Sequence, residues 1–338
     1  MVDLQWRHIS ANYKPNAITM SKNIIFRILV CAILLAAAVR DVQAQANAPG
    51  ANPAAQGGQG RGGFGRGPQP VPGPPAPVPA EVAMPRPTAE EVAKINADLQ
   101  QFIATSADKD LLQKYQSLLA VQVPRDNPCI RPVGGGVRGP RHQKFVDIAN
   151  TEDFDLLFEG DSITDWWQQQ PTQGGLGVFS NYFGNIKVAN FAVAGDTTQG
   201  LLWGLQNGEG QGHKPKAIML MIGTNNTGSN SGPEIAEGVG ADVLELRKNF
   251  PDAKILLLAI FPRGAGPTDP NRIKNEVANK IIAKLDDGKH VFFMNINDKF
   301  LDADGKMIGF RPDNLHPTAV GYEAWAAAVA PTLKGWLQ

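Results

Sequence analysis

The chain has 338 residues, of which 43% are hydrophobic and 19% are charged, so it is long enough for one large domain with extensions. Lys plus Arg and Asp plus Glu each number 32, and this balance argues against nucleic acid or an anionic membrane surface as a partner. The cysteines, Cys31 and Cys129, belong to no C-x-x-C or Cys/His cluster, which argues against a zinc site and a disulfide framework.

Residues 1–46 form an N-terminal extension that contains the parts of a secretory signal. The apolar run Ile28–Val39 follows Lys22 and Arg27 and precedes the small-x-small sequence Ala44–Ala46. This run is shorter than the roughly 20 apolar residues that a membrane span needs. We therefore expect an exported protein, periplasmic or extracellular, with no stable membrane span after signal cleavage. An uncleaved signal anchor is the alternative, and the residues before Met20 fit neither interpretation, so translation starting at Met20 also stays open.

Residues 47–87 are dominated by Pro, Gly and Ala. A segment of this composition has too little apolar area to offset the entropy lost on ordering. It is therefore predicted to be a disordered, partly extended linker. A Pro-rich recognition ligand is the alternative.

Residues 88–139 are predicted to contain a helical hairpin and a loop. Thr88 and Glu91 have the spacing of a capping box at the start of a helix. Two sets of apolar residues follow at helical spacing: Val92, Ile95, Leu99, Phe102 and Ile103, then Leu111, Leu112, Tyr115, Leu118 and Leu119. The hairpin is either an arm for dimerisation or partner docking, or an element packed on the following domain, so the oligomeric state stays open. The loop's Gly134–Gly136 run lacks the ending of a phosphate-binding loop.

From residue 140 to residue 338, short apolar segments alternate with helical ones. This alternation predicts an α/β domain whose parallel sheet is covered by helices on both faces. The candidate strands are Phe154–Phe158, Lys187–Val193, Ala217–Ile222, Ile255–Phe261 and His290–Ile296. The candidate helices are Thr198–Gln206, Pro233–Phe250, Pro270–Leu285 and Pro317–Leu333.

The most informative motif is Gly160–Thr164, with the sequence Gly-Asp-Ser-Ile-Thr, directly after the first of these strands. A serine just past the carboxyl end of a parallel strand projects from the sheet edge at which open α/β folds place their ligands. Gly-Asp-Ser alone is weak evidence, since these residues are common in turns. Further blocks strengthen it: Ala194–Thr197, Gly223–Asn226 and Asp313–Pro317.

These four blocks, in this order, resemble the SGNH/GDSL family of serine hydrolases. Within the family they are most similar to the branch that contains the platelet-activating-factor acetylhydrolase catalytic subunits and many bacterial acetyl esterases. The resemblance extends from Arg141 to Leu337. It implies a flavodoxin-like three-layer α/β/α sandwich with a five-stranded parallel sheet.

Ser162 is the candidate nucleophile, and His316 is the candidate base. A serine hydroxyl needs a base that removes its proton as it attacks a carbonyl, and histidine suits that task near neutral pH. Among the five histidines, His316 has a carboxylate three residues earlier, Asp313. One turn of chain can bring this carboxylate to the histidine Nδ1 and fix its tautomer. The alternative for Asp313 is an ordinary turn residue.

The resemblance also implies an oxyanion hole made of the Ser162 and Gly195 backbone N–H groups and the Asn225 side-chain amide. Glycine permits a close approach of the backbone to a ligand, and asparagine offers N–H donors without a charge. Asn226 is an alternative donor by type, and the family pattern selects Asn225. The structural alternatives are a strand-to-helix turn for Gly195 and a helix cap for Asn225.

Several residues near the predicted edge have weaker assignments. Asp161 is interpreted as a turn carboxylate, and Asp196 as a helix cap with a possible substrate contact. The other candidate substrate contacts are Trp166, Trp203 and Arg263, with ordinary packing as the alternative for each tryptophan. The Leu301–Gly305 stretch lacks the ligands of a calcium loop. The chemistry requires no metal and no cofactor.

The sequence thus predicts an exported serine esterase that removes a short acyl group, most simply acetyl, from a carbohydrate or another small-molecule ester. A lipid or aryl esterase, such as a lysophospholipase, with the same triad is the second enzyme hypothesis. A non-catalytic carbohydrate- or wall-binding module is a third hypothesis, and it is disfavoured because every triad member is present.

Overall fold

A computed structural model describes residues 70–123, 125–168 and 174–338. The expected signal segment, and residues 47–69 of the expected linker, lie outside the described residues. The contacts divide the described chain into two compact units, residues 90–122 and the remainder. Each unit is described by itself.

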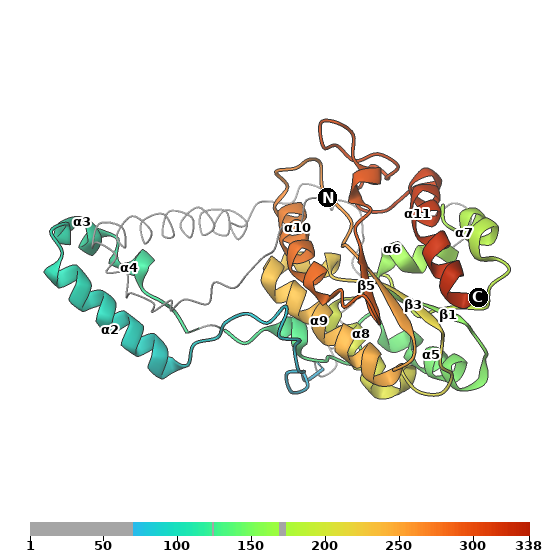
Figure 1. Ribbon diagram of the computed structural model, residues 1–338, viewed down its shortest axis with the longest axis horizontal. Helices are drawn as coiled ribbons and strands as arrows, with labels where there is room; N and C mark the ends of the chain where they lie inside the picture. The colour runs from blue at the N-terminus through green and yellow to red at the C-terminus, as the bar shows by residue number, and fades with distance from the viewer. Residues whose placement is uncertain (1–69, 124, 169–173) are drawn as a thin grey trace, which may run out of the picture. The chain divides into compact units, whose positions relative to one another are not determined.

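The larger unit is built on a five-stranded sheet in the order β2-β1-β3-β4-β5, in which all neighbours are parallel (Figure 1). The register sets Gly160 opposite Met221 and Leu156 opposite Val188. The predicted fold class is confirmed, although most strands begin or end some residues away from the predicted bounds. The strands are β1 (Leu156–Gly160), β2 (Val188–Asn190), β3 (Ala217–Met221), β4 (Lys254–Leu258) and β5 (Val291–Met294).

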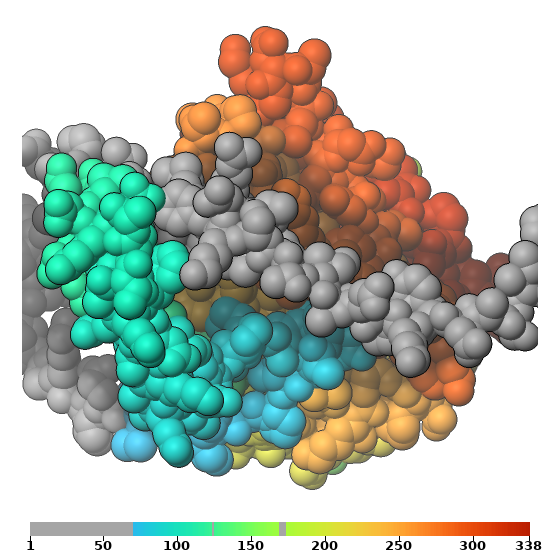
Figure 2. Space-filling view, turned by 60° about the vertical axis from the view of Figure 1, so that its left-hand side comes forward, coloured from blue at the N-terminus to red at the C-terminus, as the bar shows by residue number. Residues whose placement is uncertain are grey.

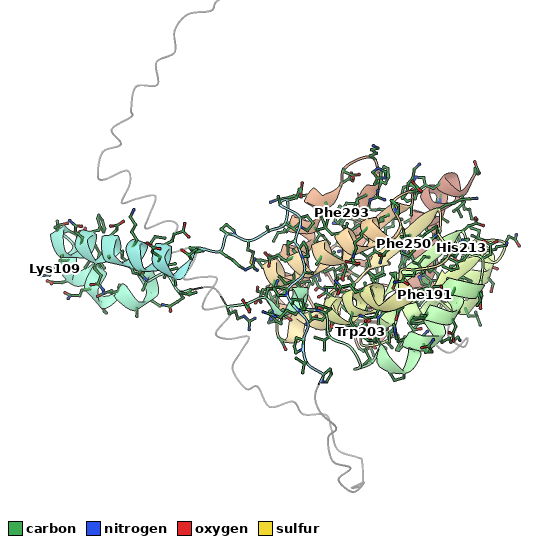
Figure 3. All side chains as sticks on the ribbon, turned by 90° about the horizontal axis from the view of Figure 1, so that it is seen from below. Lys109, Phe191, Trp203, His213, Phe250 and Phe293 are labelled. Atoms are coloured by element: carbon green, nitrogen blue, oxygen red, sulfur yellow. The ribbon has the colours of Figure 1, made fainter. Side chains whose placement is uncertain are left out.

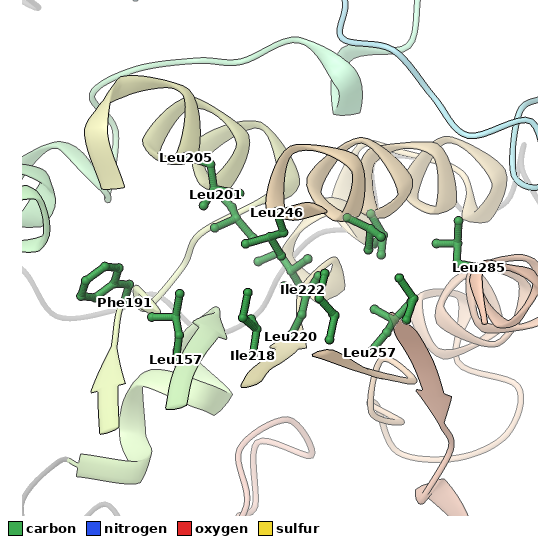
Figure 4. Packing of buried hydrophobic residues seen from close by; sticks show 14 of the residues in the cluster. Leu157, Phe191, Leu201, Leu205, Ile218, Leu220, Ile222, Leu246, Leu257 and Leu285 are labelled. Atoms are coloured by element: carbon green, nitrogen blue, oxygen red, sulfur yellow. The ribbon is translucent and has the colours of Figure 1, made fainter. Parts of the chain in front are cut away.

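Helices cover both faces of the sheet because successive strand residues point to opposite faces and both sets are apolar. Leu157, Ile218 and Leu220 pack under the helices of one face, whereas Phe158 and Met219 pack under those of the other. Figure 4 shows the first cluster, in which Leu201 and Leu246 descend onto the strand side chains. The first face carries α5 (Gly139–Thr151), α8 (Thr198–Gly204), α9 (Gly232–Asn249) and α10 (Pro270–Ile282). The second face carries α6 (Ser162–Asp165), α7 (Leu176–Phe183) and α11 (Ala319–Leu337).

Short helical turns connect these elements. Most are 3-10 turns, and η4 is a π-helical turn that extends α8. The turns are η1 (Pro128–Ile130), η2 (Trp166–Gln168), η4 (Leu205–Glu209), η5 (Thr224–Gly228), η6 (Ala283–Leu285) and η7 (Asn297–Phe300).

Residues 70–87 are ordered, contrary to the expectation of a disordered linker. The Ala76 backbone N–H donates to Ile130 O at 2.7 Å, and Val82 is buried in the core. Arg86 forms a two-pronged ion pair with the buried Glu237 of α9. Figure 2 shows this segment, in blue, against the orange surface of α9. Burial of Val82 and these polar contacts offset the entropy lost when residues 70–87 become ordered. The composition of the segment gives no sign of these contacts.

The smaller unit is the predicted hairpin, with α2 (Ala89–Thr105), α3 (Lys109–Lys114) and α4 (Gln116–Leu119). The predicted second helix is broken at Tyr115, and Lys109 marks its start in Figure 3. The Asn96 side chain ties the hairpin together, since it bonds both the N–H and the C=O of Val121 at 2.8 Å. Both interpretations of the hairpin, a docking arm and an element packed on the following domain, stay predictions. No helix among the described residues is long and apolar enough to cross a membrane.

Candidate active site

The sheet brings the predicted site residues to its carboxyl edge. Ser162 follows β1, Gly195 follows β2 and Asn225 follows β3, while Asp313 and His316 lie between β5 and α11. The carboxyl ends of parallel strands meet at one edge of a sheet, and ligands bind there in open α/β folds. Residues far apart in the sequence therefore become neighbours.

The turn that presents Ser162 is fixed by Gly160 and Asp161. A Cβ atom at Gly160 would lie 2.4 Å from Met221 O, so only glycine fits beside β3. The Asp161 carboxylate accepts the Ile163 N–H at 3.0 Å and caps α6, as expected for a turn carboxylate. Complete burial raises the pKa of Asp161 to about 7. Ser162 is the first residue of α6, where backbone N–H groups have no partner within the helix.

The structure joins Ser162, His316 and Asp313 in one chain of hydrogen bonds. His316 Nε2 lies 2.9 Å from Ser162 Oγ, and His316 Nδ1 lies 2.8 Å from Asp313 Oδ2. The second Asp313 oxygen accepts the backbone N–H groups of Leu315 and His316 at 2.9 and 3.0 Å. This is the geometry in which a carboxylate orients a histidine and the histidine can deprotonate a serine.

The Asp313 carboxyl is held in its ionised form. Partial burial raises its pKa, but the His316 backbone N–H, the His316 ring and the Leu315 N–H together bring the pKa below its ordinary value. An ionised Asp313 favours the imidazolium that forms when His316 accepts a proton.

Trp166 lies directly against the histidine of this chain. The indole and the His316 ring are stacked, with centroids 4.0 Å apart and planes 20° apart. The Arg311 guanidinium lies 5.1 Å from the Trp166 centroid. The His316 ring and the Arg311 guanidinium both contact the flat surface of the indole. Trp166 therefore supports His316 rather than offering an open platform for a sugar ring.

The predicted oxyanion residues Gly195 and Asn225 lie on two adjoining loops, joined by a hydrogen bond. Gly195 has φ of +84°, which favours glycine. The Asn225 Nδ2 donates to the Asp196 carbonyl at 2.7 Å, and this bond fixes the direction of the amide's second N–H. Asn226 is buried, with its Nδ2 2.7 Å from Gln199 Oε1 and its Oδ1 accepting the Thr198 N–H. The geometry therefore favours Asn225, the residue that the family pattern selects.

Three predicted substrate contacts have structural partners instead. Asp196 is buried, and its carboxylate accepts a hydrogen bond from Arg138 at 2.7 Å. Trp203, labelled in Figure 3, packs on His142 with ring centroids 4.4 Å apart and leaves no room for a side chain at Gly134. Arg263 donates to Thr224 O at 2.8 Å and to Thr227 Oγ1 at 3.1 Å, so it supports the loop of Asn225.

A buried cluster of charged residues beside the loop of Gly195 was not predicted. Arg138 is 1% exposed and pairs with Asp196 and Glu209, and Glu159 lies 3.5 Å away. Burial raises the pKa of Glu159 to about 8, an effect that Arg138 only partly offsets. Burial also raises the pKa values of Asp196 and Glu209. No local motif marks Arg138, since its partners lie 21 to 71 residues further along the chain.

Among the described residues, no group of His, Cys, Asp or Glu side chains is arranged to hold a metal ion.

Comparison with known proteins agrees with this geometry. The model of the GDSL-like lipase/acylhydrolase family matches residues 158–324. The platelet-activating factor acetylhydrolase IB subunit alpha2 of Rattus norvegicus is 35% identical over 184 residues, which are 54% of this chain and 77% of that protein. The subunit beta homolog of Drosophila melanogaster is 32% identical over 188 residues, 54% of this chain and 80% of that one. A solved structure from Streptococcus pneumonia, described as a platelet activating factor, is 21% identical with a TM-score of 0.50 and covers 58% of this chain and 92% of its own, which shows a shared fold.

Proposed function

Because the chain belongs to the GDSL-like lipase/acylhydrolase family and is a carboxylic ester hydrolase, we propose that Ser162, His316 and Asp313 hydrolyse short-chain esters through an acyl-enzyme. The observation that carries this proposal is the unbroken hydrogen-bond chain from Ser162 Oγ through His316 to Asp313. The substrates that we propose are O-acetyl esters of carbohydrates or similar polyols.

The geometry supports a two-stage reaction. His316 Nε2 takes the Ser162 proton as Oγ attacks the ester carbonyl, and Asp313 stabilises the resulting imidazolium. The negative charge that develops on the carbonyl oxygen is met by the Ser162 and Gly195 N–H groups and the Asn225 amide. Collapse of the tetrahedral intermediate returns the proton to the leaving alcohol, and water then repeats the sequence on the acyl-enzyme.

The acyl and alcohol parts of the substrate have different support. The relatives are named acetylhydrolases, which supports an acetyl group. The acetyl group is therefore the supported part of the substrate, and kinetics on different leaving groups tests the alcohol.

A lipid ester is the second candidate function. It is favoured by the relatives named for platelet-activating factor. The two candidates differ in the leaving group and in tolerance of acyl length, so kinetics on matched substrates separates them.

The test is a panel of acetylated mono- and oligosaccharides, an acetylated lipid, and p-nitrophenyl esters of rising chain length. We expect the highest kcat/KM on acetyl esters of sugars and a steep fall beyond short acyl chains. Ser162→Ala, with an unchanged melting curve, should lower kcat by about 10⁴-fold or more. Turnover near the wild-type level in that variant would refute the mechanism, and a preference for the lipid would refute the substrate assignment.

We also propose export of the mature protein, on the strength of the apolar run and small-x-small sequence within residues 1–46. Mass spectrometry of the protein from its host should then find a terminus near Gln45 or Asn47. An intact chain that retains Ile28–Val39 in the membrane fraction would support the signal anchor instead.

A further inference from the structure

The loop that carries Gly195 is held from both sides. On one side, the Ala194 N–H donates to Asp165 Oδ2 at 3.2 Å, and the Arg141 guanidinium donates to the other Asp165 oxygen at 2.7 Å. The Asp165 side chain is 7% exposed and the Arg141 side chain is 37% exposed, so a buried carboxylate pairs here with a partly exposed guanidinium. The residue before Gly195 is thereby tied to α6, the helix that begins with Ser162.

On the other side, Asp196 links Arg138 to both loops of the oxyanion hole. Its Oδ2 accepts the Arg138 Nε–H at 2.7 Å, while its Oδ1 accepts the Thr197 N–H at 2.9 Å. Its backbone carbonyl accepts the Asn225 Nδ2–H at 2.7 Å. One residue therefore adjoins Gly195 covalently, orients Asn225 through its carbonyl, and is held through its carboxylate.

Arg138 is anchored more firmly than a surface arginine could be. Its side chain is 1% exposed, and it also donates to Glu209, a fully buried carboxylate. Burial lowers the pKa of Arg138, but Asp196, Glu159 and Glu209 raise it above its ordinary value, so the guanidinium stays charged. The planar fork of a guanidinium can bond two carboxylates at fixed angles, which the single ammonium of lysine cannot reproduce.

We propose that Arg138 is a positioning residue that sets the oxyanion hole through Asp196, an inference that rests on the proposed function. Oxyanion stabilisation depends on donors held where charge develops, and displacements of about 1 Å can cost about 10²-fold in rate. Arg138 lies ahead of residues 158–324, which the family model matches, so the segment before β1 completes the catalytic apparatus.

The first experiment compares Arg138→Lys with the wild type on one acetyl ester. We expect kcat to fall by about 10- to 100-fold with little change in KM, since the hole acts on the transition state rather than on the bound ester. Arg247→Lys is the matched control, because Arg247 also donates to backbone carbonyls, of Phe250, Pro251 and Ala253, but does so at the amino end of β4. The control should lose stability without losing kcat.

The second experiment is a double-mutant cycle with Asn225→Ala. Because Arg138 acts on Asn225 through Asp196, the loss caused by Arg138→Lys should be smaller when Asn225 is already alanine, and the loss that remains is the part that acts through Gly195. Equal losses in both backgrounds, or a folded Arg138→Lys with kcat within about 2-fold of the wild type, would overturn the inference.

Folding is checked separately. If Arg138→Lys gives no cooperative melting transition, Asp196→Asn replaces it in the same cycle, since it keeps the carbonyl and the shape but removes the charge. If the activity depends on Ser162 but neither Arg138→Lys nor Asp196→Asn changes it, only this inference is overturned. Activity that survives Ser162→Ala instead overturns the proposed function.

Discussion

At the scale of single residues, the contact between Trp166 and His316 connects packing with catalysis. The indole is stacked on the histidine at 4.0 Å, and a cation over an aromatic face gains about 0.5–2 kcal/mol. The imidazolium that forms during turnover therefore gains more from Trp166 than neutral histidine does. The stack also restricts the ring to the plane in which it reaches both Ser162 and Asp313.

Replacing Trp166 should consequently slow turnover. Trp166→Leu is expected to lower kcat by about 2- to 30-fold, the range that corresponds to this interaction energy. Trp166→Phe keeps an aromatic face and should lose less. Steady-state kinetics on one acetyl ester measures the difference. A rise in KM with unchanged kcat would show instead that Trp166 acts by binding the substrate.

The two neighbouring asparagines should separate activity from stability. Asn225→Ala removes a donor of the proposed oxyanion hole and should cost about 10²–10³ in kcat. Asn226→Ala removes the acceptor of the buried Thr198 N–H and one of the two donors to Gln199 Oε1, so it should mainly lower the melting temperature. Kinetics and thermal melting of both variants test the assignment, and the reverse pattern would make Asn226 the oxyanion donor.

The contact among Ser162, His316 and Asp313 could be predicted because each stands in a short motif whose chemistry is local. Asp313 and His316 are three residues apart, and one turn brings them together. Arg138 could not be predicted, because only the folded sheet shows that Asp196 and Glu209 surround it. The same cluster explains why the substrate role expected for Asp196 does not fit: its carboxylate is used inside the domain.

At the scale of elements, β1 carries an unusual residue for a central strand. Glu159 is fully buried, 3.5 Å from Arg138, and burial raises its pKa to about 8. An unfolded glutamic acid has a pKa of about 4.3. Between these two values the folded chain keeps a proton that the unfolded chain has released, so the free energy of unfolding falls as the pH rises.

The melting temperature should therefore decline from about pH 5 to about pH 8. Glu159→Gln, which cannot ionise, should flatten this decline. Thermal melting of both proteins in buffers of equal ionic strength measures the slopes. Parallel curves for the two proteins would show that Glu159 does not titrate in this range, and that the other buried carboxyls carry any dependence.

Elements that rest on regular patterns were predicted well, and elements that depend on tertiary contacts were not. The helix Gly232–Asn249 matches the predicted Pro233–Phe250 closely, because a capping box and a Pro near its start mark where it begins. Helix α7 was missed, since Gly177, Val178 and Phe179 are modest helix formers. Val178 and Phe183 pack in one core cluster with side chains of α11 and of the sheet, and this packing overrides that preference.

At the scale of the whole chain, the boundary between linker and domain differs from the prediction. Composition alone assigned residues 47–87 to one disordered stretch, and their Pro and Gly content gives no local signal of order. The order of residues 70–87 comes from partners far along the chain: Ile130, Glu237 and the core around Val82. Such contacts have no signature within the segment itself.

This packing predicts that two N-terminal truncations should behave differently. A chain beginning at residue 70 keeps all contacts of the described segment with the domain, whereas one beginning at residue 88 loses Val82 and Arg86. The second truncation exposes apolar core around Val82 and leaves Glu237, which is fully buried, without the guanidinium that lowers its pKa. Breaking a buried pair by removing one partner is strongly destabilising. Because Arg86 is 34% exposed, part of that loss is screened by solvent.

We expect the melting temperature to fall by at least several degrees on going from the first truncation to the second. Glu237→Gln in the shorter chain should recover part of the loss, because the uncompensated charge is then gone. Equal melting temperatures for the two truncations would mean that residues 70–87 act only as a tether after all.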